Sequence, residues 1–127
     1  MKFEEEKPPR SFSVGNSVKF DMLDCGTVYL AENEQITFKT QSDCEYDVAR
    51  KVWGFYATPS LNGRLREFNL RGVLIQNTLS HRYFVMLVED GKEEEFEHYM
   101  DQESLEVITW LDNTKVLDAL KNSVRNI

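Results

Sequence analysis

Short runs in which apolar and polar residues alternate fill the chain between residues 18 and 48. The alternating apolar positions are Val18, Phe20 and Met22, then Val28 and Leu30, then Ile36 and Phe38, and then Tyr46 and Val48. Asp, Asn, Gly and Ser residues, which favour turns, separate these runs. Strict alternation over short runs is typical of antiparallel strands with one buried face. We therefore predict an antiparallel meander of four strands, with a fifth strand at residues 52–56.

The segment WGFYATPSLNGRL, residues 53–65, combines aromatic residues with a Thr-Pro step and an Asn-Gly pair. A hairpin is disfavoured because Pro59 has no amide hydrogen to donate to a ladder. Thr58 followed by Pro59 is instead typical of a helix start, with threonine as the cap and proline at the first helical position. The apolar residues that follow share one helical face: Leu61, Leu65 and Phe68. We predict a short helix from about Pro59 to Phe68.

Strand and helix patterns alternate in the second half of the chain. Residues 70–76 and 82–89 are separated by NTLS, a spacing that predicts a hairpin. The second arm contains YFVMLV, an uninterrupted apolar run, which predicts a central strand covered on both faces. A helix at KEEEFEHYM and a strand at SLEVITWL follow it. The length from Arg82 to Leu111 matches a β-α-β unit with two parallel strands and a right-handed crossover.

The last segment has the clearest helical pattern. Asp112 is expected to cap this helix, with Leu111 and Val116 forming a hydrophobic staple across its start. The apolar stripe consists of Val116, Leu117, Leu120 and Val124. We expect this stripe to dock on the sheet.

Together these patterns predict an α+β fold, with an N-terminal antiparallel β-meander followed by a sheet with a β-α-β unit and a C-terminal helix. Residues 1–10 mix charges with two prolines and show no period, so we predict a flexible tail there. No repeat or linker interrupts the rest, and we expect residues 11–127 to form a single globular domain.

Composition places the chain among folded, cytoplasmic proteins. Its 41% hydrophobic content over 127 residues is enough to form a core without disulfide or metal support. No apolar run approaches the length of a membrane helix, and MKFEEEKPPR lacks the apolar core of a secretory signal, so no membrane partner is predicted. Cys25 and Cys44 are too isolated for a zinc or redox motif, and we expect two free, half-buried thiols.

Charge is negative overall and unevenly distributed. The net charge of −7 argues against nucleic acid as a partner, because it repels the phosphate backbone. Residues 50–72 nevertheless carry five basic residues against Glu67 alone, whereas residues 89–106 carry nine carboxylates against Lys92 alone. The basic residues are Arg50, Lys51, Arg64, Arg66 and Arg71.

No motif signals catalysis, and no metal or cofactor is predicted. The nucleophile turn Gly-x-Ser-x-Gly and both Gly-rich phosphate loops are missing from the sequence. Glu95 and His98 have the helical spacing of di-iron ligands, but those sites need a second copy of the pair and two more glutamates. A solvated acidic helix face explains this pair more simply.

The sequence nevertheless offers one candidate ligand site, at residues 53–66. Free amides at the predicted helix start favour an anion, arginines add charge, and aromatic rings offer stacking surfaces. The candidate residues are Trp53, Tyr56, Thr58, Ser60, Asn62, Arg64 and Arg66. Two alternatives stay open: the arginines pair with the protein's own carboxylates, or the basic and acidic patches meet across subunits.

These observations lead to two functional hypotheses. The first is a non-catalytic cytosolic interaction or accessory domain, which engages a protein partner or itself through an exposed strand edge or the charged patches. The alternative is a binder of a small anionic ligand, such as a phosphorylated sugar or a nucleotide-like molecule, at Thr58–Arg64, with or without enzymatic activity. The sequence favours the non-enzymatic hypothesis.

Overall fold

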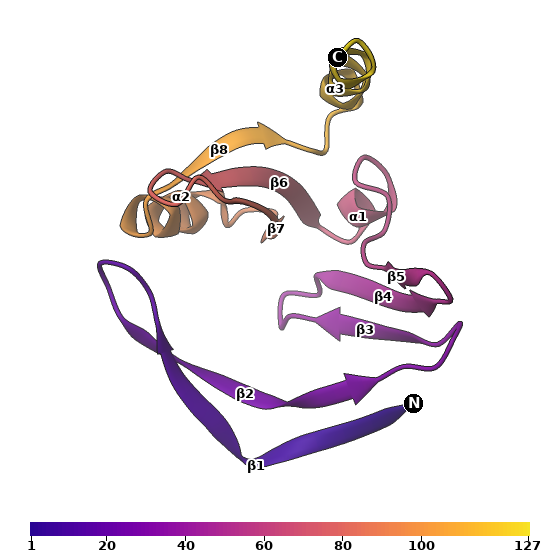
Figure 1. The fold of residues 1–127 in the computed structure, drawn as a ribbon, viewed down its shortest axis with the longest axis vertical. Helices are drawn as coiled ribbons and strands as arrows, with labels where there is room; N and C mark the ends of the chain where they lie inside the picture. The colour runs from indigo at the N-terminus through magenta and orange to yellow at the C-terminus, as the bar shows by residue number, and fades with distance from the viewer.

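The computed structural model describes all residues from Met1 to Ile127 and contains three antiparallel sheets (Figure 1). The strands are β1 (Lys2–Val14), β2 (Phe20–Tyr29), β3 (Gln35–Lys39), β4 (Glu45–Lys51), β5 (Gly54–Tyr56), β6 (Leu70–Asn77), β7 (Tyr83–Glu89) and β8 (Leu105–Trp110). The helices are α1 (Arg64–Glu67), α2 (Glu93–Gln102) and α3 (Thr114–Arg125). The sheets have the strand orders β1-β2, β3-β4-β5 and β7-β6-β8. The predicted α+β class is confirmed.

The first sheet is a long two-stranded hairpin. Its first strand includes residues 2–10, where a tail was expected, and pairs Lys2 with Tyr29 and Arg10 with Asp24. The second strand runs unbroken through DCG, where a turn was expected. Gly26 permits this because its φ of +150° favours glycine and because a Cβ at this position would clash with the Glu4 carbonyl. The two short strands predicted around residues 18–22 and 28–30 are therefore one longer strand, β2.

The third sheet and α2 hold the main core. β6 is antiparallel to both β7 and β8, so those two strands run parallel to each other, joined by α2 with β6 between them. A β-α-β unit is thus present. Its core comprises Val73, Ile75, Val88 and Met100.

The apolar run YFVMLV is an edge strand, so its predicted central position is wrong. β6 takes the central place because it forms hydrogen bonds with a strand on each side. The first half of β7 is uncovered, with Tyr83 60% and Val85 58% exposed.

A second core joins the middle of the chain to the third sheet. Cys44, Leu65 and Leu70 are buried together, and Leu61 and Leu87 pack against them. Gly72 makes this packing possible, since a Cβ at that position would lie 2.8 Å from the Leu61 side chain. The segment before α1 is thereby seated against β6.

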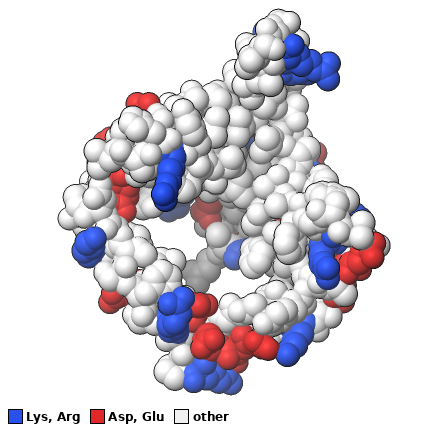
Figure 2. All heavy atoms as spheres, viewed as in Figure 1, with Lys and Arg blue, Asp and Glu red and all other residues white.

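The hairpin closes the molecule into a ring, and Figure 2 shows the resulting opening between the hairpin and the rest of the chain. At its tip, the Asn16 amide donates to the Glu103 carboxylate at 2.7 Å, and the Ser17 hydroxyl donates to the Gln102 carbonyl at 2.7 Å. At its base, the N-terminal ammonium group lies 3.0 Å from the Glu34 carboxylate. The hairpin is therefore attached at both ends.

The C-terminal helix projects away from the sheets (Figure 1) and contains no buried residue. The expectation that it docks on its own sheet is wrong. Its N-cap is Asn113, whose side chain accepts hydrogen bonds from the Lys115 and Val116 amides, and Asp112 is not the cap. Asp112 instead binds arginines, as described next.

Candidate functional site

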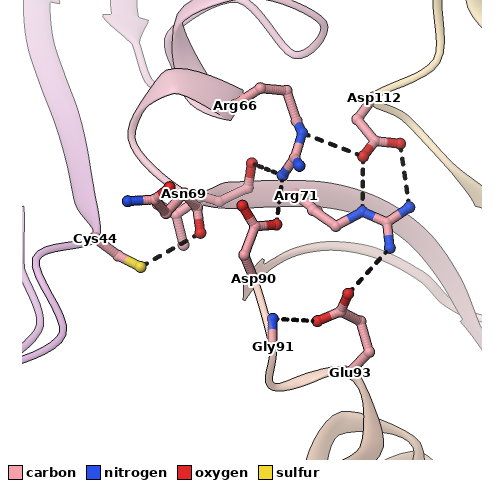
Figure 3. Close-up of polar contacts among 9 residues, drawn as sticks. Cys44, Arg66, Asn69, Arg71, Asp90, Gly91, Glu93 and Asp112 are labelled. Atoms are coloured by element: carbon pink, nitrogen blue, oxygen red, sulfur yellow. Dashed lines mark hydrogen bonds and ion pairs between the residues drawn. The ribbon is translucent and has the colours of Figure 1, made fainter.

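Arg66 and Arg71 both bind Asp112, at the point where the chain leaves β8 for α3 (Figure 3). The Arg71 Nε lies 2.7 Å and the Arg66 Nε 3.5 Å from the same carboxylate oxygen. Arg66 also contacts Asp90 at 2.7 Å, and Arg71 contacts Glu93 at 3.5 Å. This cluster joins α1, β6, the start of α2 and the exit to α3.

The cluster shifts the protonation equilibria of its members. The hydrogen bond from Arg71 lowers the pKa of Asp112 below its usual range, against an opposing effect of burial. The same hydrogen bond raises the pKa of Arg71. The Arg71 guanidinium also lies 4.0 Å from the centre of the Trp110 ring. Because these groups satisfy one another, the cluster is a structural clamp.

Arg64 is likewise engaged within the protein. Its guanidinium lies 3.1 Å from the buried carboxylate of Asp47 and 5.0 Å from the Phe68 ring centre. Arg64, Arg66 and Arg71 thus pair with the protein's own carboxylates, one of the two alternatives left open by the sequence. Most acidic side chains of α2 form no ion pair; they are Glu94, Glu95, Glu97 and Asp101.

The helix predicted from Pro59 to Phe68 is shorter than expected. A turn occupies residues 61–63, and α1 begins only at Arg64. Thr58 does not cap it; the Ser60 hydroxyl accepts a hydrogen bond from the Arg64 amide at 2.7 Å. Asn-Gly favours a turn over a helix, which explains the late start.

The remaining predicted site residues lie in two places, with the aromatic pair on the β4–β5 hairpin and Asn62 beside the start of α3. Trp53 is 68% and Tyr56 53% exposed on the β4–β5 hairpin, and the Asn62 amide donates to the Thr114 hydroxyl at 3.0 Å. Trp53 lines an open depression of about 540 Å³ between the end of β2 and the β4–β5 hairpin. Its basic residues are Arg50 and Lys51, and Arg64 and Arg66 do not line it. Ligand binding at the predicted residues stays a prediction.

Two uncovered apolar surfaces stand out in the folded chain. The first, the α3 stripe, consists of Val116, Leu117, Leu120 and Val124, and every residue of α3 is at least partly exposed. The second, the open sheet face, consists of Leu74, Tyr83 and Val85.

Strand geometry defines the open sheet face. Leu74 lies opposite Val85, and Gln76 lies opposite Tyr83, so these side chains share one face of the sheet. Val73 and Ile75 point to the other face, which α2 covers. Sequence reasoning missed this surface because it took the uninterrupted run in β7 as evidence of burial.

The junction between β8 and α3 is firmly held. Leu111 is buried, and its amide donates to the Gly72 carbonyl at 2.8 Å. Asp112 is clamped by two arginines, and Thr114 is bound to Asn62. Contacts at three of the four residues from 111 to 114 therefore set the direction in which α3 leaves the sheet.

The structure also places the acidic, histidine and cysteine side chains relative to one another. No group of three or more His, Cys, Asp or Glu side chains is arranged to hold a metal ion. Both cysteines are free; Cys25 is exposed, Cys44 is buried, and burial raises the pKa of the Cys44 thiol. None of the three helices has the length and apolarity that crossing a membrane requires.

No protein-family model, curated protein or solved structure matches the chain.

Proposed function

We propose that the chain is a non-catalytic interaction domain that binds a protein partner through the α3 stripe. The observation that carries this proposal is a strongly amphipathic helix without a single buried residue. Burying a Val or Leu side chain contributes about 1.5–3 kcal/mol, so a helix with this pattern gains most when a second surface covers it. Laying an amphipathic helix onto an apolar surface is a recurrent mode of protein recognition.

Helix length supports the same conclusion. α3 has 12 residues, and isolated helices of about 12–15 residues or fewer are marginally stable in water. Most helical stability in proteins comes from packing an apolar face, which this helix lacks within its own chain. Docking would therefore stabilise the helix as well as the complex.

Leu120→Glu tests the proposal, with Asn122→Glu as the matched control on the same helix. Leu120 lies in the α3 stripe and Asn122 outside it, and both are exposed. Neither change should alter the free energy of unfolding of the isolated chain by more than about 0.5 kcal/mol. We expect Leu120→Glu alone to abolish association, measured by light scattering of purified protein and by quantitative capture from lysate. The proposal fails if no self-association and no captured protein depends on Leu120.

A second candidate function is binding of a small anionic ligand in the depression beside Trp53. The observation that favours it is that Arg50 and Lys51 line this depression and neither forms an ion pair with a carboxylate. Their side chains instead donate to the Leu30 carbonyl and the Asn33 side chain. Charge for an anion is therefore available here, in contrast to the start of α1.

Thermal melting with phosphate, nucleotides and nucleotide sugars tests this candidate. A ligand at a hundred times its dissociation constant stabilises a protein by about 2.7 kcal/mol. Arg50→Ala should remove the stabilisation, whereas Arg82→Ala, at an exposed basic residue outside the depression, should retain it. An equal response in both variants would rule out this site.

A further inference from the structure

We propose that the partner of α3 is a second copy of this chain, and that two copies exchange their C-terminal helices reciprocally. In this arrangement the α3 stripe of each copy covers the open sheet face of the other. The inference rests on the proposed function, because it names the partner of the same helix.

The open sheet face offers the apolar surface that α3 lacks. Leu74, Tyr83 and Val85 lie on one side of β6 and β7; Tyr83 is 60% and Val85 58% exposed, and Leu74 is half-buried. At the other end of this face, near Gly72 and Leu87, Leu61 from the segment before α1 and Leu65 of α1 pack against the sheet. A sheet with one apolar face normally packs against a helix or a second sheet. One chain thus presents both surfaces of a helix-on-sheet contact, the α3 stripe and the open sheet face, and the two do not contact each other.

The contacts at the junction after β8 oppose a meeting of the α3 stripe and the open sheet face within one chain. Folding α3 back onto its own sheet would require a change of direction at residues 111–114. That change would break the hydrogen bond between Asn62 and Thr114 and strain the arginine clamp on Asp112. A second copy can supply the sheet face without disturbing these contacts.

Charge favours this contact over the pairing of two α3 helices. α3 carries three basic residues against one aspartate, a charge of +2 in a chain of −7, and Figure 2 shows basic atoms on the projecting helix at the top of the view. Two α3 helices would repel each other. The open sheet face instead carries Glu106, which lies opposite Gln76 and forms no ion pair.

Reciprocal exchange also gives a closed assembly. Each copy donates one helix and accepts one, so a two-fold axis relates two identical contacts and no further copy can be added at these surfaces. The expected product is a dimer.

The exchange is tested by mutating the α3 stripe and the open sheet face separately and then mixing the two variants. Leu120→Glu damages the helix and leaves the sheet face intact, whereas Val85→Glu damages the sheet face and leaves the helix intact. Asn122→Glu and Ser80→Glu are exposed control positions near each surface. By sedimentation, the wild type and both controls should dimerise, and each damaging variant should weaken dimerisation at least about tenfold. An equimolar mixture of the damaging variants should form a heterodimer, because one of its two contacts is intact.

Other outcomes overturn the exchange and separate it from the proposed function. A wild type that stays monomeric into the high micromolar range excludes a self-partner. Dimerisation that depends on Leu120 but not on Val85, with no recovery on mixing, indicates that α3 docks elsewhere, for example on another α3. In either case, association or capture that still depends on Leu120 leaves the proposed function standing. If nothing depends on Leu120, both proposals fail.

Discussion

The segment from Cys44 to Leu111 and the two segments that flank it differ sharply in burial. All 11 buried residues lie within that segment, and the flanks contain none. The flanks nevertheless carry large apolar side chains such as Phe12, Phe20 and Leu120. The difference lies in their neighbours, because β6 has a strand on each side and α2 on one face, whereas β1 and β2 have only each other. A two-stranded hairpin alone is marginally stable in water, so apolar pattern without a second surface does not create a core.

The largest loss in the free energy of unfolding should come from a substitution in the core of residues 44–111. Ile75→Ala removes a fully buried side chain and should lower the free energy of unfolding by about 2–5 kcal/mol. Phe12→Ala, in the hairpin, removes a larger side chain that is 37% exposed and should cost clearly less. Urea unfolding of both variants measures the difference. Equal losses would mean that the hairpin contributes to stability as the core does.

The next effect concerns the clamp at the border between the core and α3. Asp112→Asn should cost about 1–3 kcal/mol, since it weakens the hydrogen bonds from Arg71 and removes the ion pair with Arg66. The native pKa of Asp112 is lowered, so its contribution is complete above the unfolded pKa of about 3.9 and is lost as pH falls through the native value. The stability gap between wild type and variant should therefore close in acid. A gap that is unchanged from neutral to acidic pH would contradict the clamp.

A smaller effect is expected at the hairpin tip. Ser17→Ala removes an exposed hydrogen bond to the Gln102 carbonyl and should cost no more than about 1 kcal/mol. The change should instead accelerate hydrogen exchange at the amides near the tip, including that of Asn16, which donates to Glu103. Ser13→Ala, on the same hairpin, is the control. Unaltered exchange in Ser17→Ala would show that the tip is held by other contacts.

The smallest effect on stability should come from the two thiols. Cys25→Ser, at an exposed position, should change the free energy of unfolding by no more than about 0.5 kcal/mol. Native protein should react with a thiol reagent at Cys25 and resist it at Cys44, because burial shields the Cys44 thiol and raises its pKa. Native Cys25→Ser should therefore remain unlabelled until it is unfolded. Rapid labelling of that variant would place Cys44 outside the core.

The sequence predicted the elements whose pattern is local. β6, β7, α2 and β8 lie within one or two residues of their expected limits, because each has a continuous pattern and NTLS supplies the turn between the first two. The prediction missed β1, since Pro8 and Pro9 and the mixed charges hide its pairing with β2. Which strand is central depends on partners far along the chain, so the apolar run in β7 was misplaced.

The candidate site shows the same limit. The exposed aromatic residues at Trp53 and Tyr56 follow from a short strand next to a turn, and the pairing of the arginines was one of the stated alternatives. Asp112, which binds both Arg66 and Arg71, lies 41 positions from Arg71 in the sequence, and only the fold brings them together. The α3 stripe was identified correctly as an amphipathic pattern, whereas its uncovered state depends on the direction set at the junction.

Because the β1–β2 hairpin is attached at both its tip and its base, its orientation relative to the rest of the chain is restrained. Its tip rests on the loop between α2 and β8, and its base is fastened beside β3. The hairpin can change its orientation only if the contacts at one end break. Each exposed hydrogen bond contributes only about 1 kcal/mol of free energy. Opening of the tip therefore costs little free energy compared with unfolding of the core.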